Sequence, residues 1–315
     1  MGTNTDSAGS AIPKVGIFPN AKFDVEHALS IYAYSFNTFA APFLYDKSFI
    51  ESTKQSTQSF HIYLIGYLPK MRTNIAYEEN GTLCISVTLM GKDVVVRFPI
   101  PPGLKLSTDG NEWFMLDQAG ERRWIDPTEF ASEVNKSAGG IPFTVKYIGQ
   151  SYGDGGSRNA IDRLLKHETL QQISVKGVPE GSVLQILLLE IQTNNQIFTV
   201  FYPKAKDMDT DGKRVRNGLD KLFRTTDAER ISLYEAALIR YFLPEFNKEF
   251  KNSFPSTNLK VLQDCYKKDF LGLVAEIYID KLPFRLCSES VKPSVYHAAQ
   301  YDLHNDADRK MFFSK

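Results

Sequence analysis

Hydrophobic and polar residues alternate with different periods along the first part of the chain. Residues 23–43 carry apolar side chains at near-helical spacing, including Val25, Leu29 and Tyr32, and this spacing predicts a helix. From His61 onward, short runs rich in β-branched and aromatic residues predict strands. These runs occupy residues 61–65, 82–87 and 93–98, and a further hairpin is expected from residues 112–116 and 122–125. The pattern predicts a β-rich domain over about residues 15–135, after a flexible polar N-terminus at residues 1–14.

A polar, glycine-containing stretch at residues 135–140 marks the expected end of that domain. After it, the pattern predicts a strand at 143–148, a glycine-rich turn, and a helix with Ile161 and Leu164 on its apolar face. Strands at 182–192 and 196–202 are expected next, followed by a polar, charged connection at 204–224.

The last predicted helix begins at Thr226, because Thr226 and Glu229 have capping-box spacing, and it ends before Pro244. Beyond it, one strand is expected at residues 273–279. The sequence therefore predicts an α+β fold with a β-rich N-terminal domain, a second domain at residues 136–258, and a C-terminal extension at 259–315.

Composition narrows the possible classes of function. The 315 residues contain 37 Lys and Arg and 37 Asp and Glu, so the formal net charge is zero. A surface that is cationic over the whole molecule is excluded, and a nucleic-acid site has to be a local basic patch. Three cysteines without Cys-x-x-Cys spacing argue against a disulfide framework and a cysteine-rich zinc site. A cytoplasmic protein with no membrane partner is expected, since neither a signal-peptide pattern nor an apolar run of membrane-spanning length occurs.

Four side chains in the second half form a set suited to phosphate chemistry. Tyr147 stands near the end of a predicted strand, and Gly149 leaves room for a backbone or ligand to approach. Arg163 and His167 are four residues apart on a predicted helix and share one face of it; a guanidinium binds a phosphate diester well. Glu235 lies within the next helix, and its carboxylate is a hard oxygen ligand that suits one Mg²⁺. Together these groups are the components of metal-assisted phosphodiester hydrolysis.

At these residues the sequence resembles the GIY-YIG nuclease family over about residues 140–252. The matching elements are Tyr147-Ile148-Gly149 for the second half of the motif, Arg163 with His167, Glu235, and Asn247 in Pro-x-x-Asn. The resemblance implies a GIY-YIG-like domain, a small three-stranded antiparallel sheet flanked by helices. It implies that Glu235 holds one Mg²⁺ or Mn²⁺, and that Tyr147 or a water linked to it supplies the nucleophile. By the same resemblance Arg163 stabilises the scissile phosphate, and His167 assists at the attacking or leaving oxygen.

The first half of the motif departs from the family pattern. Gly140-Ile141 is followed by Pro142 instead of a tyrosine, so the first tyrosine is absent there and the hairpin to Tyr147 is too short. A strand from further upstream, near Trp113-Phe114-Met115 or Trp124, is the expected replacement. The sequence leaves open which tyrosine acts as the general base.

Further residues are expected to bind the substrate because they flank the catalytic residues or form a local cationic cluster. The cluster lies in the connection at residues 204–224, where it would follow a nucleic-acid backbone. The substrate-binding residues predicted in this way are Lys146, Gly149, Gln150, Asn247, Lys213, Arg214 and Arg216.

The same connection contains a second pattern, in which Asp207 to Gly212 begins like a calcium-binding loop. Such a loop needs a glutamate at its twelfth position, where this chain has Gly218. We therefore do not predict a calcium site there.

The predicted function is a metal-dependent endonuclease that hydrolyses phosphodiester bonds of nucleic acid, with DNA as the expected substrate, in restriction, repair or bacterial defence. The N-terminal domain would recognise the target or a protein partner. The alternative is a catalytically degenerate GIY-YIG fold that serves as a DNA- or protein-binding module.

Overall fold

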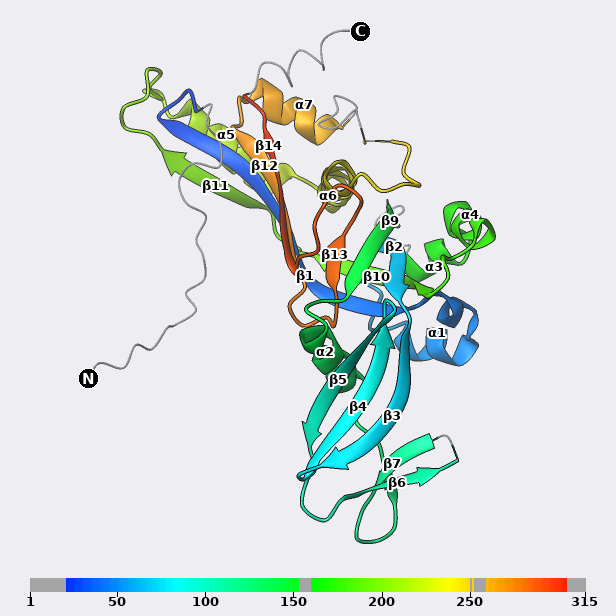
Figure 1. Cartoon of the computed structure of the whole chain (residues 1–315). Helices are drawn as coiled ribbons and strands as arrows, with labels where there is room; N and C mark the ends of the chain where they lie inside the picture. The colour runs from blue at the N-terminus through cyan, green and yellow to red at the C-terminus, as the bar shows by residue number, and fades with distance from the viewer. Residues whose placement is uncertain (1–20, 111, 153–159, 250, 252–258, 305–315) are drawn as a thin grey trace, which may run out of the picture.

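The computed structural model describes residues 21–304 except residues 111, 153–159, 250 and 252–258. The fold is mixed α+β, as predicted, with one large curled sheet of eight strands and two small three-stranded antiparallel sheets (Figure 1). The predicted flexible segment at residues 1–14 lies outside the described residues. No helix within the described part of the chain is both long and apolar enough to cross a bilayer.

The large sheet has the strand order β13-β9-β2-β10-β1-β12-β14, and β11 pairs with β1 beside this path. Its strands are β1 (Val25–Ala40), β2 (Ile62–Pro69), β9 (Pro142–Gln150), β10 (Ser182–Ile191), β11 (Gln196–Phe201), β12 (Gly272–Tyr278), β13 (Arg285–Cys287) and β14 (Tyr296–Asp302). The sheet takes strands from all three segments that the sequence distinguishes. The boundaries expected near residues 135 and 258 therefore do not separate one sheet from another.

The helix predicted over residues 23–43 is wrong, because most of this segment forms the long strand β1. The first half of β1 pairs with β11 on one side and its middle pairs with β12 on the other, while its second half pairs with β10. Every residue from Val25 to Ile31 is buried. A strand covered on both faces loses the alternation that identifies a half-exposed strand, so its apolar residues matched a helical spacing by chance.

The chain between β2 and β9 forms an arm that extends from one side of the large sheet (Figure 1). Two antiparallel sheets and one helix make up the arm: β3 (Met71–Glu79), β4 (Thr82–Leu89) and β5 (Lys92–Pro99), then β6 (Lys105–Asp109), β7 (Glu112–Leu116) and β8 (Arg122–Arg123), then α2 (Pro127–Ser137). The strands predicted at 61–65, 82–87, 93–98 and 112–116 are confirmed. The apolar core of the arm is continuous with that of the large sheet.

Helices cover both faces of the large sheet. A short 3-10 helix (Ala41–Tyr45), α1 (Lys47–Thr53), α3 (Ala160–Leu164) and α4 (Glu168–Lys176) pack on one face, where Tyr63 and Ile65 of β2 point. The other face holds the larger core, to which α6 (Asp227–Phe242) and α7 (Lys260–Lys267) contribute. The predicted capping box at the start of α6 is confirmed.

Two parts of the second half differ from the prediction. The polar connection at 204–224 contains a helix, α5 (Lys213–Arg224), whose buried positions include Arg214 and Lys221; charged residues on the inner side hid the helix from a pattern search. The strand predicted at 273–279 is confirmed as β12. The strands β13 and β14 were missed, because β13 has three residues and β14 contains small and polar residues.

Candidate active site

The strands β2 and β9 bring two tyrosines together. They are antiparallel neighbours, with Tyr63 opposite Gly149 and Ile65 opposite Tyr147. The other edge of β2 pairs, also antiparallel, with β10. The segment His61-Ile62-Tyr63 therefore faces Tyr147-Ile148-Gly149 across the sheet.

The strand expected near Trp113 or Trp124 does not face Tyr147, so that prediction is wrong. The strands β7 and β8 belong to the small sheet of the arm, where they pair with each other, and β7 also pairs with β6. The facing strand comes from much further upstream because the whole arm is inserted between β2 and β9. Tyr63 is thus the residue that sequence reasoning missed. Its one sequence signal is the apolar run beginning at His61, which lacks the glycine of the family motif.

Gly149 is required by the close approach of the two tyrosine rings. A Cβ atom at this position would lie 2.6 Å from Cζ and Oη of Tyr63 and 2.8 Å from Cε1 of Tyr147. The two ring centroids are 6.2 Å apart, and Tyr63 acts to lower the pKa of Tyr147. The role predicted for Gly149, to leave room for a close approach, is filled here by protein side chains.

His167 packs against both rings, with its centroid 4.9 Å from that of Tyr147 and 5.5 Å from that of Tyr63. It is buried, and its Nδ1 accepts a hydrogen bond of 3.2 Å from the backbone N–H of Leu170 as the N-cap of α4. Burial and the charge of Arg163 lower the pKa of His167 to about 4. The imidazole is therefore neutral at pH 7, and with Nδ1 accepting, its proton is assigned to Nε2.

Arg163 lies on the exposed side of this cluster. Its guanidinium acts to lower the pKa of Tyr63, against the larger effect of burial. The expectation that Arg163 and His167 share one helix is wrong, since α3 ends at Leu164 and His167 caps the following helix. They nevertheless lie close together, because the Arg163 charge contributes to the lowered pKa of His167.

Glu235 reaches the cluster from α6. Burial raises the pKa of its carboxyl group to about 8. Hydrogen bonds from Gln150 and the charge of Arg163 act in the opposite direction, whereas Glu249 adds repulsion. Burial also raises the pKa values of Tyr63 and Tyr147, and the Glu235 charge raises both further. Both phenols are therefore protonated at neutral pH.

The four residues predicted to be catalytic, Tyr147, Arg163, His167 and Glu235, thus interact within one cluster, with Tyr63 as a fifth member. Gln150, predicted to bind substrate, adjoins this cluster: besides Glu235, its side chain contacts Ser232, with 3.2 Å between Nε2 and Oγ. The arrangement presents one exposed guanidinium, two phenols, a neutral imidazole and a carboxyl group in a poorly solvated position.

Two of the predicted substrate-binding residues have structural partners instead. The buried Asn247 accepts a hydrogen bond of 2.9 Å from the N–H of Ile148 and donates one of 2.8 Å to its carbonyl oxygen. Lys146 forms ion pairs of 3.0 Å with Glu245 and 3.2 Å with Glu289. Asn247 therefore fixes the backbone of β9 and is not available to a ligand, so its prediction is wrong. Lys146 carries no free charge toward the site.

The predicted cationic cluster lies apart from the tyrosines. The helix α5 packs on β11 and the start of β1, whereas β2 and β9 lie beyond β10, which pairs with the second half of β1 (Figure 1). Arg214 is buried and pairs with Glu26 at 2.8 Å, and it also donates to the carbonyl of Asp269. The prediction that Arg214 binds substrate is therefore wrong. Lys213 and Arg216 are exposed, and a role for them in nucleic-acid binding stays a prediction.

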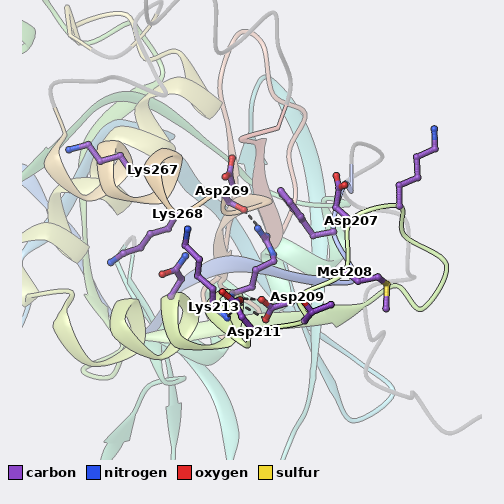
Figure 2. A pocket seen from close by; sticks show the side chains of 13 residues that line it. Asp207, Met208, Asp209, Asp211, Lys213, Lys267, Lys268 and Asp269 are labelled. Atoms are coloured by element: carbon purple, nitrogen blue, oxygen red, sulfur yellow. Dashed lines mark hydrogen bonds between the residues drawn. The ribbon is translucent and has the colours of Figure 1, made fainter.

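A polar pocket opens beside the first turn of α5, at the segment that resembles a calcium loop (Figure 2). The carboxylates there serve the helix: Asp209 accepts from the N–H of Arg214 at 3.1 Å, and Asp211 accepts from that of Lys213 at 2.9 Å. Among the residues that the structure describes, no three His, Cys, Asp or Glu side chains form a group able to hold a metal ion. Gly218 lies within α5, where a Cβ would come within 2.7 Å of the His27 ring.

Comparison with known proteins does not assign the site. No protein-family model matches the sequence, and no curated protein and no solved structure gives a significant match. The interpretation of the site therefore rests on its own geometry and chemistry.

Proposed function

We propose that this protein is a metal-dependent nuclease of the GIY-YIG type that hydrolyses phosphodiester bonds of DNA in the cytoplasm, in restriction, repair or defence. The observation that carries the proposal is the position of Tyr63, opposite Gly149 and beside Tyr147, with Arg163, His167 and Glu235 around the pair. The strands β9, β2 and β10 are antiparallel neighbours within the eight-stranded sheet and do not form a separate small sheet. Their antiparallel pairing supports the proposal, because the resemblance implies three antiparallel strands. The first tyrosine of the motif is absent next to Gly140-Ile141, and this absence favoured the alternative of a degenerate binding module. In this proposal Tyr63 takes the place of that tyrosine.

Glu235 fits a single divalent cation. An oxygen ligand whose burial disfavours its own negative charge gains from a nearby cation, and Mg²⁺ commonly binds through one carboxylate while retaining waters. When bound, Mg²⁺ or Mn²⁺ would supply positive charge next to the phosphate oxygens.

The protein's own side chains bind the phosphate, orient the attacking water and form hydrogen bonds to the reacting oxygens. Arg163, exposed and positively charged, binds the scissile phosphate through its planar donor groups. Tyr63 and Tyr147, both protonated, orient the attacking water by hydrogen bonds. His167, with its proton assigned to Nε2 and kept neutral by its low pKa, donates a hydrogen bond to the attacking or leaving oxygen and keeps its proton. The proton that the attacking water loses passes to solvent, and the leaving oxygen takes one from solvent. Residues 70–141, the arm, supply recognition of the target or a protein partner.

Nicking of supercoiled plasmid DNA tests this proposal. Purified protein with Mg²⁺ or Mn²⁺ is expected to convert supercoiled to relaxed DNA, and Glu235→Gln is expected to abolish the conversion. Glu276→Gln changes a partly buried carboxyl group on β12, which is separated from β2 by β1 and β10, and serves as the matched control. Arg163→Ala and Tyr63→Phe should each reduce the rate by at least about a hundredfold, by analogy with the loss of one preorganised donor.

Direct binding of Mn²⁺, measured by calorimetry, separates the metal site from catalysis. The wild type should bind one ion, and Glu235→Gln should bind none. DNA binding that weakens with salt, without metal-dependent nicking, would instead support the binding module. Equal nicking by wild type and Glu235→Gln would exclude the proposed nuclease site.

A further inference from the structure

The helix α5 is oriented with its apolar side toward solvent. Its positions Val215, Leu219 and Phe223, four residues apart, form one stripe and are 43%, 48% and 79% exposed. The inner side carries Arg214 and Lys221, which are neutralised by Glu26 at 2.8 Å and Asp264 at 2.8 Å. A helix that buries its cations in ion pairs and exposes its apolar stripe is unusual for a surface without a partner.

The neighbouring strand β11 extends this apolar surface. Within the described residues it pairs with β1 alone, so its other edge is free. Phe198 and Phe201 of β11 are 47% and 67% exposed. Side chains alternate between the two faces of a strand, so the two lie on opposite faces. Phe201 shares with Thr199 the face that α5 covers, since Thr199 contacts His27 and His27 contacts the Arg214 carbonyl. Phe201 and the α5 stripe define the α5–β11 surface, made of Phe201, Val215, Leu219 and Phe223. Its two phenylalanines alone expose roughly 300 Å², at about 200 Å² for each side chain.

The free edge of β11 lacks the features that normally prevent edge-to-edge pairing. Its residues, Gln196 to Phe201, include no charge, no proline and no bulge against β1, although natural edge strands usually carry such protection. The N–H of Tyr202 donates a hydrogen bond to the carbonyl of Asp24, so the backbone groups of Tyr202 point toward β1. Because donors alternate in direction along an antiparallel pair, the backbone groups of residues 197, 199 and 201 point outward.

We propose that the α5–β11 surface binds a second copy of this chain, with the two β11 strands pairing antiparallel about a twofold axis at Thr199. The outward backbone groups of the two copies then form hydrogen bonds with each other. Thr199 lies opposite Thr199, and Ile197 of one copy lies opposite Phe201 of the other. An isologous contact of this kind requires a self-complementary surface, and an uncharged edge is self-complementary. The zero net charge of the chain adds no long-range repulsion.

The apolar surface supplies part of the area that such a dimer needs, and the paired β11 edges supply the rest. A stable interface buries about 800 Å² per partner, with an apolar centre and a polar rim. The exposed phenylalanine surface would supply that centre, and Lys213 and Arg216 lie at the rim. Pairing would join the two large sheets into one and would leave the tyrosine site, which lies beyond β10, open. The proposal is independent of the proposed catalysis, because a single site suffices to nick one strand.

Light scattering coupled to size-exclusion chromatography tests the dimer. The wild-type chain is expected to have twice its 35.7 kDa monomer mass, whereas Phe223→Lys and Phe201→Lys are expected to weaken the dimer at least tenfold. Val175→Lys changes a side chain that is 87% exposed on α4, outside the surface, and should remain dimeric. A wild type that is monomeric at all concentrations overturns the proposal, as does a Phe223→Lys variant with unchanged association.

Disulfide trapping tests the register. The three native cysteines, Cys84, Cys265 and Cys287, are buried, so an introduced surface cysteine reports without background. Directly opposed residues in a hydrogen-bonded pair have Cα atoms about 5.5 Å apart, within the range of a disulfide. Thr199→Cys should therefore form a covalent dimer on mild oxidation, and Val175→Cys should not. Equal trapping of the two variants, or none at Thr199→Cys in a dimeric protein, contradicts the proposed pairing.

Discussion

At the scale of single residues, burial makes the ionised form of the Glu235 carboxyl group unfavourable when no cation lies nearby. Burial raises its pKa to about 8, and the Gln150 hydrogen bonds offset only part of this effect. Its pKa in the unfolded chain is near 4.5. Between these two pH values the folded protein holds a proton that the unfolded chain releases, so this group makes the folded state progressively less stable as the pH rises from about 4.5 to about 8.

Replacing Glu235 by glutamine should remove that pH dependence. We expect Glu235→Gln to be more stable than the wild type at pH 8, by up to a few kcal/mol at about 1.4 kcal/mol per pKa unit, and similar to it near pH 4.5. Urea unfolding at both pH values measures the difference. Addition of Mg²⁺ at pH 8 should stabilise the wild type and leave the variant unchanged. An equal effect of Mg²⁺ on both proteins would show that the ion binds elsewhere.

The contact between Gly149 and the tyrosine rings makes a second prediction at this scale. Gly149→Ala should cost about 1–3 kcal/mol of unfolding free energy, because its Cβ would overlap Tyr63 and the rings would have to shift. The cost should be smaller in a Tyr63→Leu background, where the ring that causes the overlap is absent. A double-mutant cycle by chemical denaturation measures this coupling, and additive effects would contradict the geometry.

At the scale of elements, Asn247 links the segment after α6 to the strand that carries Tyr147. Its side chain satisfies both the N–H and the carbonyl of Ile148. Asn247→Ala would leave two buried backbone groups without partners, each costing about 1–3 kcal/mol. We expect a loss of stability in that range and a lower nicking rate, since Tyr147 and Gly149 flank Ile148. Asn247→Asp keeps the acceptor and loses the donor, and should lie between the wild type and Asn247→Ala.

The elements also show what sequence patterns could and could not predict. The strand at Tyr147 and the capped helix of Glu235 were predicted correctly, because both have a regular pattern and a local stop or start signal. Two elements were not. The strand β1 is buried on both faces, and α5 turns Arg214 and Lys221 inward. In both elements, contacts with distant parts of the chain determine which positions are apolar. A short stretch of sequence does not contain information about those contacts.

At the scale of the whole molecule, the site is assembled from segments that the sequence separates widely. Tyr147, Arg163, His167 and Glu235 were predicted as site residues because their order and residue types resemble those of a known family. Tyr63 was not, since the arm lies between it and Tyr147, and strand pairing across so long an insertion has no local signal. The predicted substrate contact at Arg214 failed for a related reason: its partner Glu26 is distant in the sequence, so a buried ion pair resembled a free cation.

That ion pair belongs to a buried charge network that joins three distant parts of the chain. Glu26 is fully buried and accepts hydrogen bonds from Arg214 on α5 at 2.8 Å and from His304, after β14, at 3.1 Å. Burial acts to raise the pKa of Glu26, but the hydrogen bond and charge of His304, with the hydrogen bonds from the backbone N–H groups of Phe23 and Lys22, hold this pKa below its usual value. Its contribution to stability is therefore present above the usual carboxyl pKa and is lost as the pH falls through the lowered one.

Glu26→Gln should accordingly destabilise the whole fold, by about 3–5 kcal/mol, because it leaves the Arg214 charge buried without its partner. The difference from the wild type should be full at pH 7 and should shrink in strong acid, where the wild-type carboxyl group is itself protonated. Chemical denaturation across this pH range measures it. Glu168→Gln, an exposed change on α4, should have little effect at any pH. A Glu26→Gln variant as stable as the wild type at pH 7 would mean that α5 and the segment after β14 are held against β1 by apolar packing alone.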